Sequence, residues 1–220
     1  MSNIVNEFVE QYIRDMLPQN TGIIKEMEDY AEENNVPIIQ PEVAKLLEVI
    51  IKMSNIKSVL EIGTAIGYSA SIFTRAMGKK GKVVTIEKSE NMYKIANENI
   101  KKAGYESNIE VIFGDAKDVL PKIEGKFDMI FLDAAKGHYQ EFFSLCFDKL
   151  KDNGIIVSDN VLYKGMIASN KYVMRRKITI VKRMRKYLTC ISNNPDLITS
   201  IVPIGDGVAL SYKMGRSYSE

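Results

Sequence analysis

The sequence predicts a doubly wound α/β fold, in which a mostly parallel, seven-stranded sheet ends in an antiparallel hairpin. Two observations predict it. From residue 58 onward, short apolar runs alternate with stretches of helical periodicity, which is typical of a parallel sheet covered by helices. Five consecutive strand-like runs also end in, or just before, an acidic residue. The 220 residues, 45% of them hydrophobic, are enough for one substantial core.

Three amphipathic helices are predicted before the first strand, over residues 3–17, over residues 22–34 and from Pro41 onward. Their apolar residues recur at spacings of three and four. The first helix should end before Pro18, and Pro41 suits the first position of the third. We expect a single domain, with residues 1–55 as a helical cap and residues 56–220 as the α/β core.

The remaining elements are expected in alternation. Strands are predicted at 59–62, 82–87, 109–113, 127–132 and 155–157, and helices at 68–77, 89–103 and 138–149, with a short helical turn at 115–120. A last helix is predicted over 172–191, with Met174, Ile178, Val181, Leu188 and Ile191 on one face. The segments 198–204 and 208–212, around Gly205-Asp206-Gly207, predict a closing hairpin.

Composition limits the classes of function. No apolar stretch approaches the ~20 residues that cross a bilayer, and charged residues stand where a signal peptide would be apolar, so we expect a cytoplasmic protein without a membrane partner. Cys146 and Cys190 lie beside apolar residues and form no C-x-x-C pair. Core or surface thiols are therefore favoured over a disulfide or a zinc site.

The net charge of +2 conceals an uneven distribution. No acidic residue lies between Asp159 and Asp196, whereas the rest of the chain has 21 basic against 28 acidic residues. The basic residues of this segment are Lys164, Lys171, Arg175, Arg176, Lys177, Lys182, Arg183, Arg185 and Lys186. An acid-free basic stretch is a candidate surface for nucleic acid, although a solvated Lys/Arg-rich helix face is the simpler alternative.

The acids at the strand ends predict a nucleoside-binding site, because ligands of open parallel sheets bind at the carboxyl ends of the strands. Glu87 ends the second strand, where it can accept the two ribose hydroxyls. Gly63-x-x-x-Gly67 lacks the spacing of a dinucleotide or P-loop motif, so a nucleoside without phosphates fits better. S-adenosylmethionine meets this description. Its adenine would lie at Gly114-Asp115-Ala116 and its cationic tail near Glu61, unless Glu61 is a structural carboxylate.

Asp133, Asp159 and Asn160 predict a metal site. They follow neighbouring strands and offer two carboxylates and an amide, the oxygen ligands that hard cations prefer. Magnesium is the favoured ion, and two substrate oxygens would complete its coordination. Helix capping by Asp133 and a turn at Asp159-Asn160 is the structural alternative.

Lys136 should lie in the same loop as Asp133, where a partly desolvated amine could accept a proton as a general base. A solvated lysine is equally compatible with the sequence. His138, the only histidine, begins a predicted helix and is expected to pack or cap.

These motifs resemble the metal-dependent O-methyltransferases, the family that includes catechol and caffeoyl-CoA methyltransferases. The segments that carry the resemblance are Glu61 to Ser69, Glu87, Gly114 to Ala116, Phe131 to Lys136 and Ser158 to Leu162. The segments Val36 to Ile38, Asp159 to Gly165 and Pro203 to Gly207 are most similar to the bacterial tRNA 5-hydroxyuridine methyltransferases of that family. No match to the substrate-recognition loop of the plant coenzyme A enzymes is evident.

The resemblance implies a role for each matched residue. Lys136 would be the general base, and Asp133, which would also touch the cofactor, Asp159 and Asn160 would hold magnesium. S-adenosylmethionine would be contacted by Ile39, Glu61, Gly63, Tyr68, Ser69, Glu87, Gly114, Asp115, Ala116 and Asp133. A homodimer is also implied.

The acceptor is predicted from the charge distribution. In both catechol and 5-hydroxyuridine two neighbouring oxygens can chelate one metal, so the metal chemistry fits either. A tRNA anticodon arm carries a phosphate on each nucleotide and would bind the basic segment, whereas a catechol needs no such surface. We therefore expect tRNA as substrate. The residues expected to bind it are Lys164, Arg175, Arg176, Lys177, Lys182 and Arg183. Methylation of small catechol-like metabolites, or RNA binding without catalysis, are the alternatives.

Overall fold

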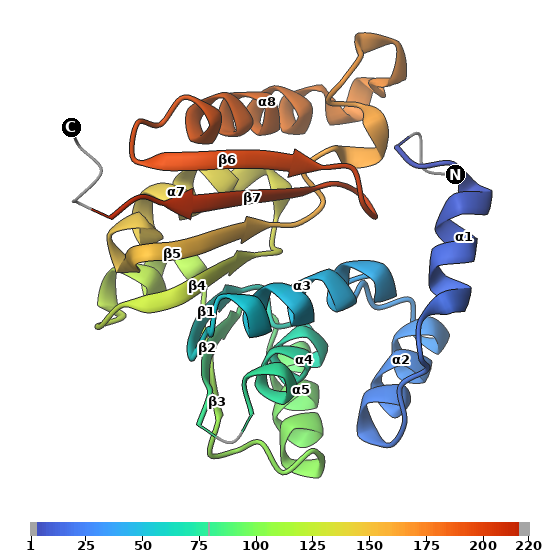
Figure 1. Ribbon diagram of the computed structural model, residues 1–220, viewed down its shortest axis with the longest axis vertical. Helices are drawn as coiled ribbons and strands as arrows, with labels where there is room; N and C mark the ends of the chain where they lie inside the picture. The colour runs from blue at the N-terminus through green and yellow to red at the C-terminus, as the bar shows by residue number, and fades with distance from the viewer. Residues whose placement is uncertain (1–3, 79, 216–220) are drawn as a thin grey trace. The chain divides into compact units, whose positions relative to one another are not determined.

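The computed structural model describes residues 4–78 and 80–215, which form two compact units (Figure 1). The N-terminal unit comprises residues 13–122. The C-terminal unit comprises residues 123–215 together with residues 4–12. The α/β class is confirmed, with a mixed sheet of seven strands.

Two helices of the N-terminal unit are built as predicted around apolar faces. α2 (Ile23–Glu33) buries Ile24, Met27 and Ala31, and α3 (Pro41–Met53) begins at the predicted proline. α1 (Glu7–Met16) crosses from residues 4–12 into this unit and buries none of its residues. Arg14 ties its end to α3, because its guanidinium donates two hydrogen bonds of 2.8 Å to the Glu42 carboxylate.

The strands of the N-terminal unit are β1 (Ser58–Ile62), β2 (Lys82–Glu87) and β3 (Ile109–Phe113). They run parallel in the order β3-β2-β1, with Ile62 paired to Ile86 and Glu87 paired to Phe113. Their carboxyl ends therefore lie at one edge. The helices that follow them are α4 (Tyr68–Met77), α5 (Glu90–Lys102) and the short α6 (Ala116–Val119), each of which contacts β2.

The strands of the C-terminal unit follow the order β4-β5-β7-β6. β4 (Phe127–Leu132) and β5 (Leu150–Ser158) are parallel. β6 (Leu197–Val202) and β7 (Val208–Lys213) form the predicted antiparallel hairpin, and β7 pairs with β5. α7 (Tyr139–Cys146) contacts β4, and α8 (Ile178–Ser192) runs along β6 (Figure 1).

The last helix begins later than predicted. Residues 170–172 and 175–177 form two separate 3-10 turns, and the continuous helix begins at Ile178. Met174 is consequently not on the helix, and both Met174 and Ile178 are exposed, whereas Val181, Leu188 and Ile191 are buried as predicted. The prediction began the helix too early because the apolar spacing of a helix continues through the two turns before it. Those turns are closed by hydrogen bonds from the Val173 and Lys177 amides, which leave no mark in that spacing.

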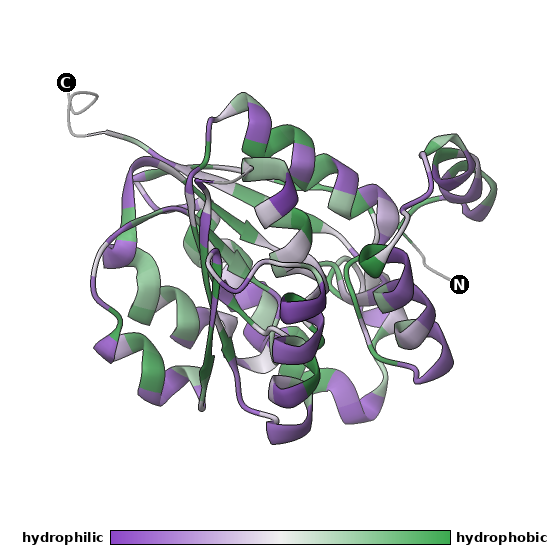
Figure 2. Cartoon of the chain, turned by 90° about the horizontal axis from the view of Figure 1, so that it is seen from below, coloured by the Kyte–Doolittle hydropathy of each residue, from purple (hydrophilic) through white to green (hydrophobic). Residues whose placement is uncertain are grey.

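The helices carry apolar and polar residues on different sides, which Figure 2 shows by colour. Within the described residues, no helix combines the length and the apolar composition that crossing a bilayer requires. Both cysteines are free thiols, as predicted, and Cys146 is buried. The division into a cap and a core stays a prediction.

Candidate functional site

Glu61 lies at the end of β1 and is completely buried. Its Oε1 accepts a hydrogen bond from the Ser69 hydroxyl, and its Oε2 accepts one of 2.6 Å from Thr85 Oγ1. The buried carboxylate is thus paired on both oxygens, as a buried charge must be. The pairing fixes Ser69 at the start of α4. These bonds fit the structural alternative for Glu61, and its role at the cofactor tail stays a prediction.

Glu87 organises the loops at the same strand edge. Its Oε2 accepts a hydrogen bond of 2.9 Å from the Ala65 amide, and its Oε1 accepts one of 2.8 Å from the Ser89 amide. Each carboxylate oxygen can accept a further bond, so the group can still receive two hydroxyls. The backbone carbonyl of Glu87 also accepts from the Gly114 amide at 2.9 Å. The predicted residues Glu87 and Gly114 are thereby brought together.

Gly114 requires the absence of a side chain. Its φ is +153°, and a Cβ there would lie 2.8 Å from a methyl group of Val119. The following Asp115 caps α6 by accepting from the Lys117 amide at 3.0 Å. The backbone at 114–116 is therefore a fixed turn beside Glu87, as an adenine-binding segment would need.

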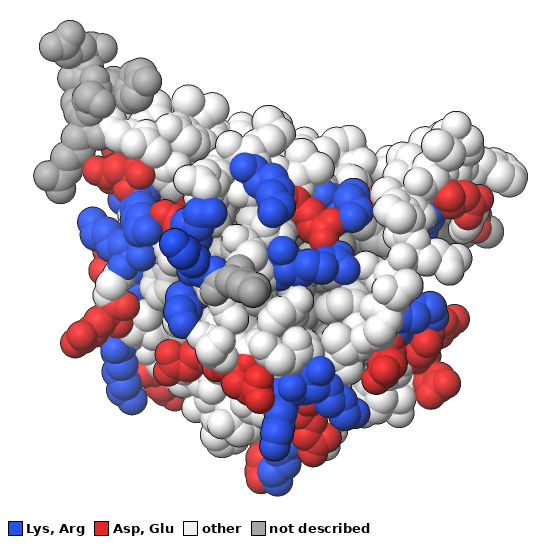
Figure 3. Space-filling view, turned by 60° about the horizontal axis from the view of Figure 1, so that its bottom comes forward, with Lys and Arg blue, Asp and Glu red and all other residues white. Residues whose placement is uncertain are grey.

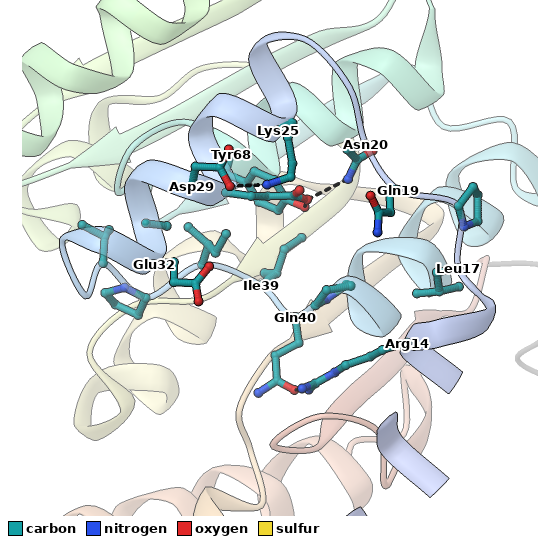
Figure 4. Close-up of a pocket in the computed structure, with 17 residues that line it drawn as sticks. Arg14, Leu17, Gln19, Asn20, Lys25, Asp29, Glu32, Ile39, Gln40 and Tyr68 are labelled. Atoms are coloured by element: carbon teal, nitrogen blue, oxygen red, sulfur yellow. Dashed lines mark hydrogen bonds and ion pairs between the residues drawn. The ribbon is translucent and has the colours of Figure 1, made fainter. Parts of the chain in front are cut away.

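Ile39 and Tyr68 line a separate cavity of about 760 Å³ within the N-terminal unit (Figure 4). The Tyr68 hydroxyl donates a 2.6 Å hydrogen bond to Glu28, and Asn20 donates one of 2.7 Å to the same oxygen. Burial, followed by the bond to Glu28, raises the pKa of Tyr68 well above its usual value. The residues that line this cavity come from α1, α2, the segments beside them and the start of α4, and include none of the predicted residues at the strand ends.

The predicted metal ligands do meet in the C-terminal unit. Leu132 pairs with Ser158, so Asp133 and Asp159 each follow directly after paired residues. Asn160 Nδ2 donates to Asp133 Oδ1 at 3.1 Å, and the Asn160 amide donates to Asp159 Oδ1 at 2.7 Å. Asn160 adopts φ +59°, which is unusual for a residue other than glycine.

The charges of this cluster suit a cation. Burial raises the pKa of Asp133, against the opposing effect of Lys136 and the bond from Asn160. Burial also raises the pKa of Asp159, and the negative charge of Asp133 raises it further. Asp159 is buried and Asp133 is half-buried. A bound divalent cation would relieve the repulsion between their carboxylates, and the amide oxygen of Asn160 adds a third hard donor. The donor set therefore fits magnesium. Among the described residues, no cluster holds three or more Asp, Glu, His or Cys side chains.

Two tyrosines form hydrogen bonds at the end of β5. The Tyr139 hydroxyl donates to the Asp159 carbonyl at 2.9 Å, and the Tyr187 hydroxyl shares a 2.5 Å hydrogen bond with Ser158. Their rings meet edge to face, with 5.6 Å between centroids. The end of β5 is thus held by one hydrogen bond from α7 to the Asp159 backbone and one from α8 to the Ser158 side chain, which the sequence did not predict.

Lys136 lies over an aromatic ring. Its ammonium group is 5.4 Å from the centre of Tyr163, and the ammonium group of Lys177 is 5.8 Å from the same ring. Cations over an aromatic face are stabilised by its electron density. The positive charge of Lys136 also acts to lower the pKa values of Asp133 and Asp159, so the group lies near both carboxylates. His138 stands at the N-cap position of α7 without a side-chain capping bond. Its Nδ1 instead lies 3.0 Å from a carboxylate oxygen of Glu141, and its ring packs 6.0 Å from that of Phe142.

The predicted nucleic-acid residues lie along one continuous segment. Arg175, Arg176 and Lys177 form a 3-10 turn, and Lys182 and Arg183 follow on α8. Within the part of the chain that the structure describes, Arg175, Arg176 and Lys182 are exposed and form no ion pair. The face shown in Figure 3, by contrast, mixes Lys and Arg with Asp and Glu. Arg185 faces inward and bonds to the carbonyls of Ile167 and Met166.

Asp206 was missed by the sequence reasoning. It lies in the turn between β6 and β7, and its charge contributes to raising the pKa of Asp159. The signal was present, because Gly205-Asp206-Gly207 places an acid in a turn, but nothing in the sequence indicated which loop that turn approaches. The ring of Tyr163 beneath Lys136 was missed for the same reason.

Comparison with known proteins identifies the family. The family model described as "O-methyltransferase" matches residues 17–214. A protein of Niastella koreensis named catechol O-methyltransferase is 33% identical over 173 residues, which cover 76% of this chain and 78% of that protein. Caffeoyl-CoA O-methyltransferase 2 of Petunia hybrida is 28% identical and covers 95% of this chain and 91% of its own length.

Solved structures agree. A putative caffeoyl-CoA O-methyltransferase of Staphylococcus aureus has a TM-score of 0.88 at 33% identity, covering 94% of this chain and 100% of its own. An O-methyltransferase of Bacillus cereus, solved in complex with SAH, has a TM-score of 0.83 at 27% identity and covers 94% of this chain and 97% of its own. With the family model matched over residues 17–214 and the fold matched along most of the chain, this chain belongs to the O-methyltransferase family.

Proposed function

We propose that this protein is an S-adenosylmethionine- and magnesium-dependent O-methyltransferase that converts 5-hydroxyuridine at the wobble position of tRNA to 5-methoxyuridine. The observation that carries the choice of acceptor is in the C-terminal unit. That unit holds both the Asp133, Asp159 and Asn160 cluster and the acid-free basic segment 164–186, in which most Lys and Arg side chains are exposed. A polyanionic acceptor accounts for both features, whereas a small neutral acceptor accounts for the first only.

The cofactor assignment is supported by the N-terminal unit. Glu87 would accept the ribose hydroxyls, and the fixed turn 114–116 would lie against the adenine. The O-methyltransferase of Bacillus cereus that resembles this chain was solved with SAH. S-adenosylmethionine, when bound, supplies an electrophilic methyl group.

In the acceptor site, the carboxylates of Asp133 and Asp159 and the amide of Asn160 would hold the cation. Magnesium, when bound, lowers the pKa of a hydroxyl group that it coordinates and orients that group. Lys136 would accept the hydroxyl proton. Its position beside the cluster supports this role, because its charge acts on both Asp133 and Asp159. Tyr139 holds the backbone of Asp159 and so keeps the ligands in place.

Methyl transfer to small catechols is the second candidate. It is favoured by the 33% identity to a protein named catechol O-methyltransferase. A 5-hydroxyuridine presents its 5-hydroxyl beside the 4-carbonyl, and a catechol presents two adjacent hydroxyls. Both can chelate one metal, so the cluster alone does not choose between them.

One experiment separates the candidates. The protein is incubated with methyl-labelled S-adenosylmethionine and magnesium, and with tRNA carrying 5-hydroxyuridine, the same tRNA carrying uridine, or free catechol. We expect label in the first tRNA only, and none after chelation of the metal. Faster labelling of catechol than of the hydroxylated tRNA would assign the second candidate. Labelling of neither acceptor would reject both.

A further inference from the structure

The turn between β6 and β7 is hydrogen-bonded to the loop that follows Asp159 and Asn160. The Asp206 carboxylate accepts a hydrogen bond from the Lys164 amide, and the Asp206 carbonyl accepts one of 3.0 Å from the Leu162 amide. One residue further on, the Gly207 carbonyl accepts from the Val161 amide at 2.9 Å. Three amides of the loop 161–164 are therefore bound by two consecutive residues of the turn.

The loop needs this support because its backbone is strained. Asn160, Tyr163 and Lys164 have φ values of +59°, +48° and +56°, in the left-handed region that residues other than glycine seldom adopt. Such backbone conformations are unfavourable, so the surrounding structure must hold these residues in place. The loop begins at one proposed metal ligand, Asn160, and includes Tyr163, whose ring lies under Lys136.

The loop also packs closely against the turn at Gly207. Gly207 has φ +87°, and a Cβ at this position would lie 2.4 Å from Leu162 Cγ. The turn and the loop therefore approach as closely as a glycine permits. Asp206 also interacts electrostatically with the cluster. Its negative charge raises the pKa of Asp159, and the positive charge of Lys136 acts to lower the pKa of Asp206.

We propose that Asp206 is a positioning residue of the metal centre: through the Lys164 amide it holds the loop 161–164, and thereby Asn160 and Tyr163, in the arrangement that binds the cation. The proposal rests on the proposed function for the identity of the cation. It goes beyond that function because Asp206 lies on a different strand connection from every predicted ligand and contacts the loop rather than the cation.

The test compares three variants. Asp206→Ala removes the acceptor for the Lys164 amide, and Asp206→Asn retains an acceptor oxygen without the charge. Asp196→Ala is the matched control, because Asp196 is exposed and directly precedes β6, and its replacement removes the same charge. Affinity for Mn²⁺, a spectroscopic substitute for Mg²⁺, is measured by paramagnetic resonance of the free ion, without cofactor or acceptor. Hydrogen exchange of the peptide 159–166 is measured on the metal-free proteins.

We expect Asp206→Ala to weaken Mn²⁺ binding by about 10-fold or more, in the range found for groups that orient metal ligands, and to accelerate exchange of the loop amides. Asp206→Asn should stay within about threefold of the wild type in binding, and Asp196→Ala should change neither measurement. A positioning role also predicts that excess magnesium restores most of the turnover of Asp206→Ala.

Other outcomes overturn the proposal. Wild-type Mn²⁺ affinity in Asp206→Ala would overturn it, and so would equal loss in Asp206→Asn, because the charge would then matter rather than the hydrogen bond. If Asp206→Ala does not fold, the Asp206→Asn variant and its exchange rates decide between these outcomes. A wild-type protein that binds no Mn²⁺ would instead refute the metal dependence of the proposed function, while the exchange data would still report whether Asp206 anchors the loop.

Discussion

Asp159 is the residue of the candidate site in which burial, charge and a fixed backbone position coincide. It is 3% exposed, it follows β5 directly, and its backbone is held by the Tyr139 hydroxyl. A buried carboxylate beside a second one is unfavourable unless a cation compensates for the charge. Asp159 therefore gives the sharpest test of the metal centre at the residue scale.

Asp159→Ala is expected to abolish methyl transfer, with a loss of at least about 100-fold, because a cation ligand is removed. Binding of S-adenosylmethionine, measured by calorimetry, should stay within about twofold, since its proposed ligands Glu87 and Gly114 lie in the N-terminal unit. Asp152→Ala, an exposed acid on the same strand, is the control. Retention of activity in Asp159→Ala, or full activity of the wild type in a chelator, would contradict the metal site.

Glu87 is the corresponding residue for the cofactor. Glu87→Gln should weaken S-adenosylmethionine binding by about 10-fold, because hydrogen bonds from ribose hydroxyls to a charged acceptor are each stronger by roughly 1 kcal/mol than to a neutral one. The amide retains an oxygen for one of the two backbone bonds. Calorimetric titration gives the affinity, and Glu110→Gln on β3, which is exposed, is the matched control. Unchanged affinity in Glu87→Gln would remove the ribose assignment.

At the scale of elements, the basic segment distinguishes an RNA acceptor from a small one. Arg175 and Arg176 are exposed on a 3-10 turn and Arg183 on α8, whereas the partly buried Arg185 ties α8 to the carbonyls of Met166 and Ile167 within the same segment. The anchored arginine is structural, which leaves the outer residues available to phosphates.

Replacing Arg175, Arg176 and Arg183 with alanine should weaken tRNA binding and flatten its salt dependence. Each lost phosphate contact lowers the slope of log affinity against log salt by about 0.7 to 0.9, so three contacts lower it by roughly 2 to 3. Binding is measured by fluorescence anisotropy from low to high salt. Alanine at Lys101, Lys102 and Lys122, which are exposed elsewhere, removes the same charge and should change the slope little. Equal effects in both triple variants would show that only net charge matters.

For the whole molecule, buried cysteine and tyrosine side chains limit the stability of the fold at alkaline pH. Burial raises the pKa of Cys146 to about 12, and burial also raises the pKa values of Tyr68, Tyr139 and Tyr187. In each case the folded protein keeps a proton that the unfolded chain loses, so the stabilisation is complete below the unfolded pKa and is lost as pH rises towards the folded one.

We therefore expect the free energy of unfolding to fall steadily above about pH 9. Cys146 alone can contribute up to about 4 kcal/mol over three pH units. Urea unfolding at pH 8, 9, 10 and 11 measures this. The stability difference between the wild type and Cys146→Ala should shrink as pH rises, whereas the difference for Ile130→Val, a buried change without a titrating group, should stay constant. A wild-type stability that is flat to pH 11 would contradict the assignment.

Much of the fold could be predicted because its signals are local. β2, β3, β4 and α4 begin and end as predicted, since apolar runs and turn residues are read from neighbouring positions. The extended prediction for the last helix was wrong at its start, because the hydrogen bonds that make two turns before Ile178 leave no periodic signal.

By itself the sequence determined the strand ends, and therefore that Asp133 and Asp159 would each follow neighbouring parallel strands. That inference needs only the rule that parallel strands end at one edge. The tertiary structure decided the partners: Ser69 and Thr85 on Glu61, Tyr163 beneath Lys136, and Asp206 on the loop after Asn160. These contacts join residues as distant in sequence as Lys164 and Asp206, which are 42 positions apart, through side-chain directions and loop conformations that no local pattern encodes.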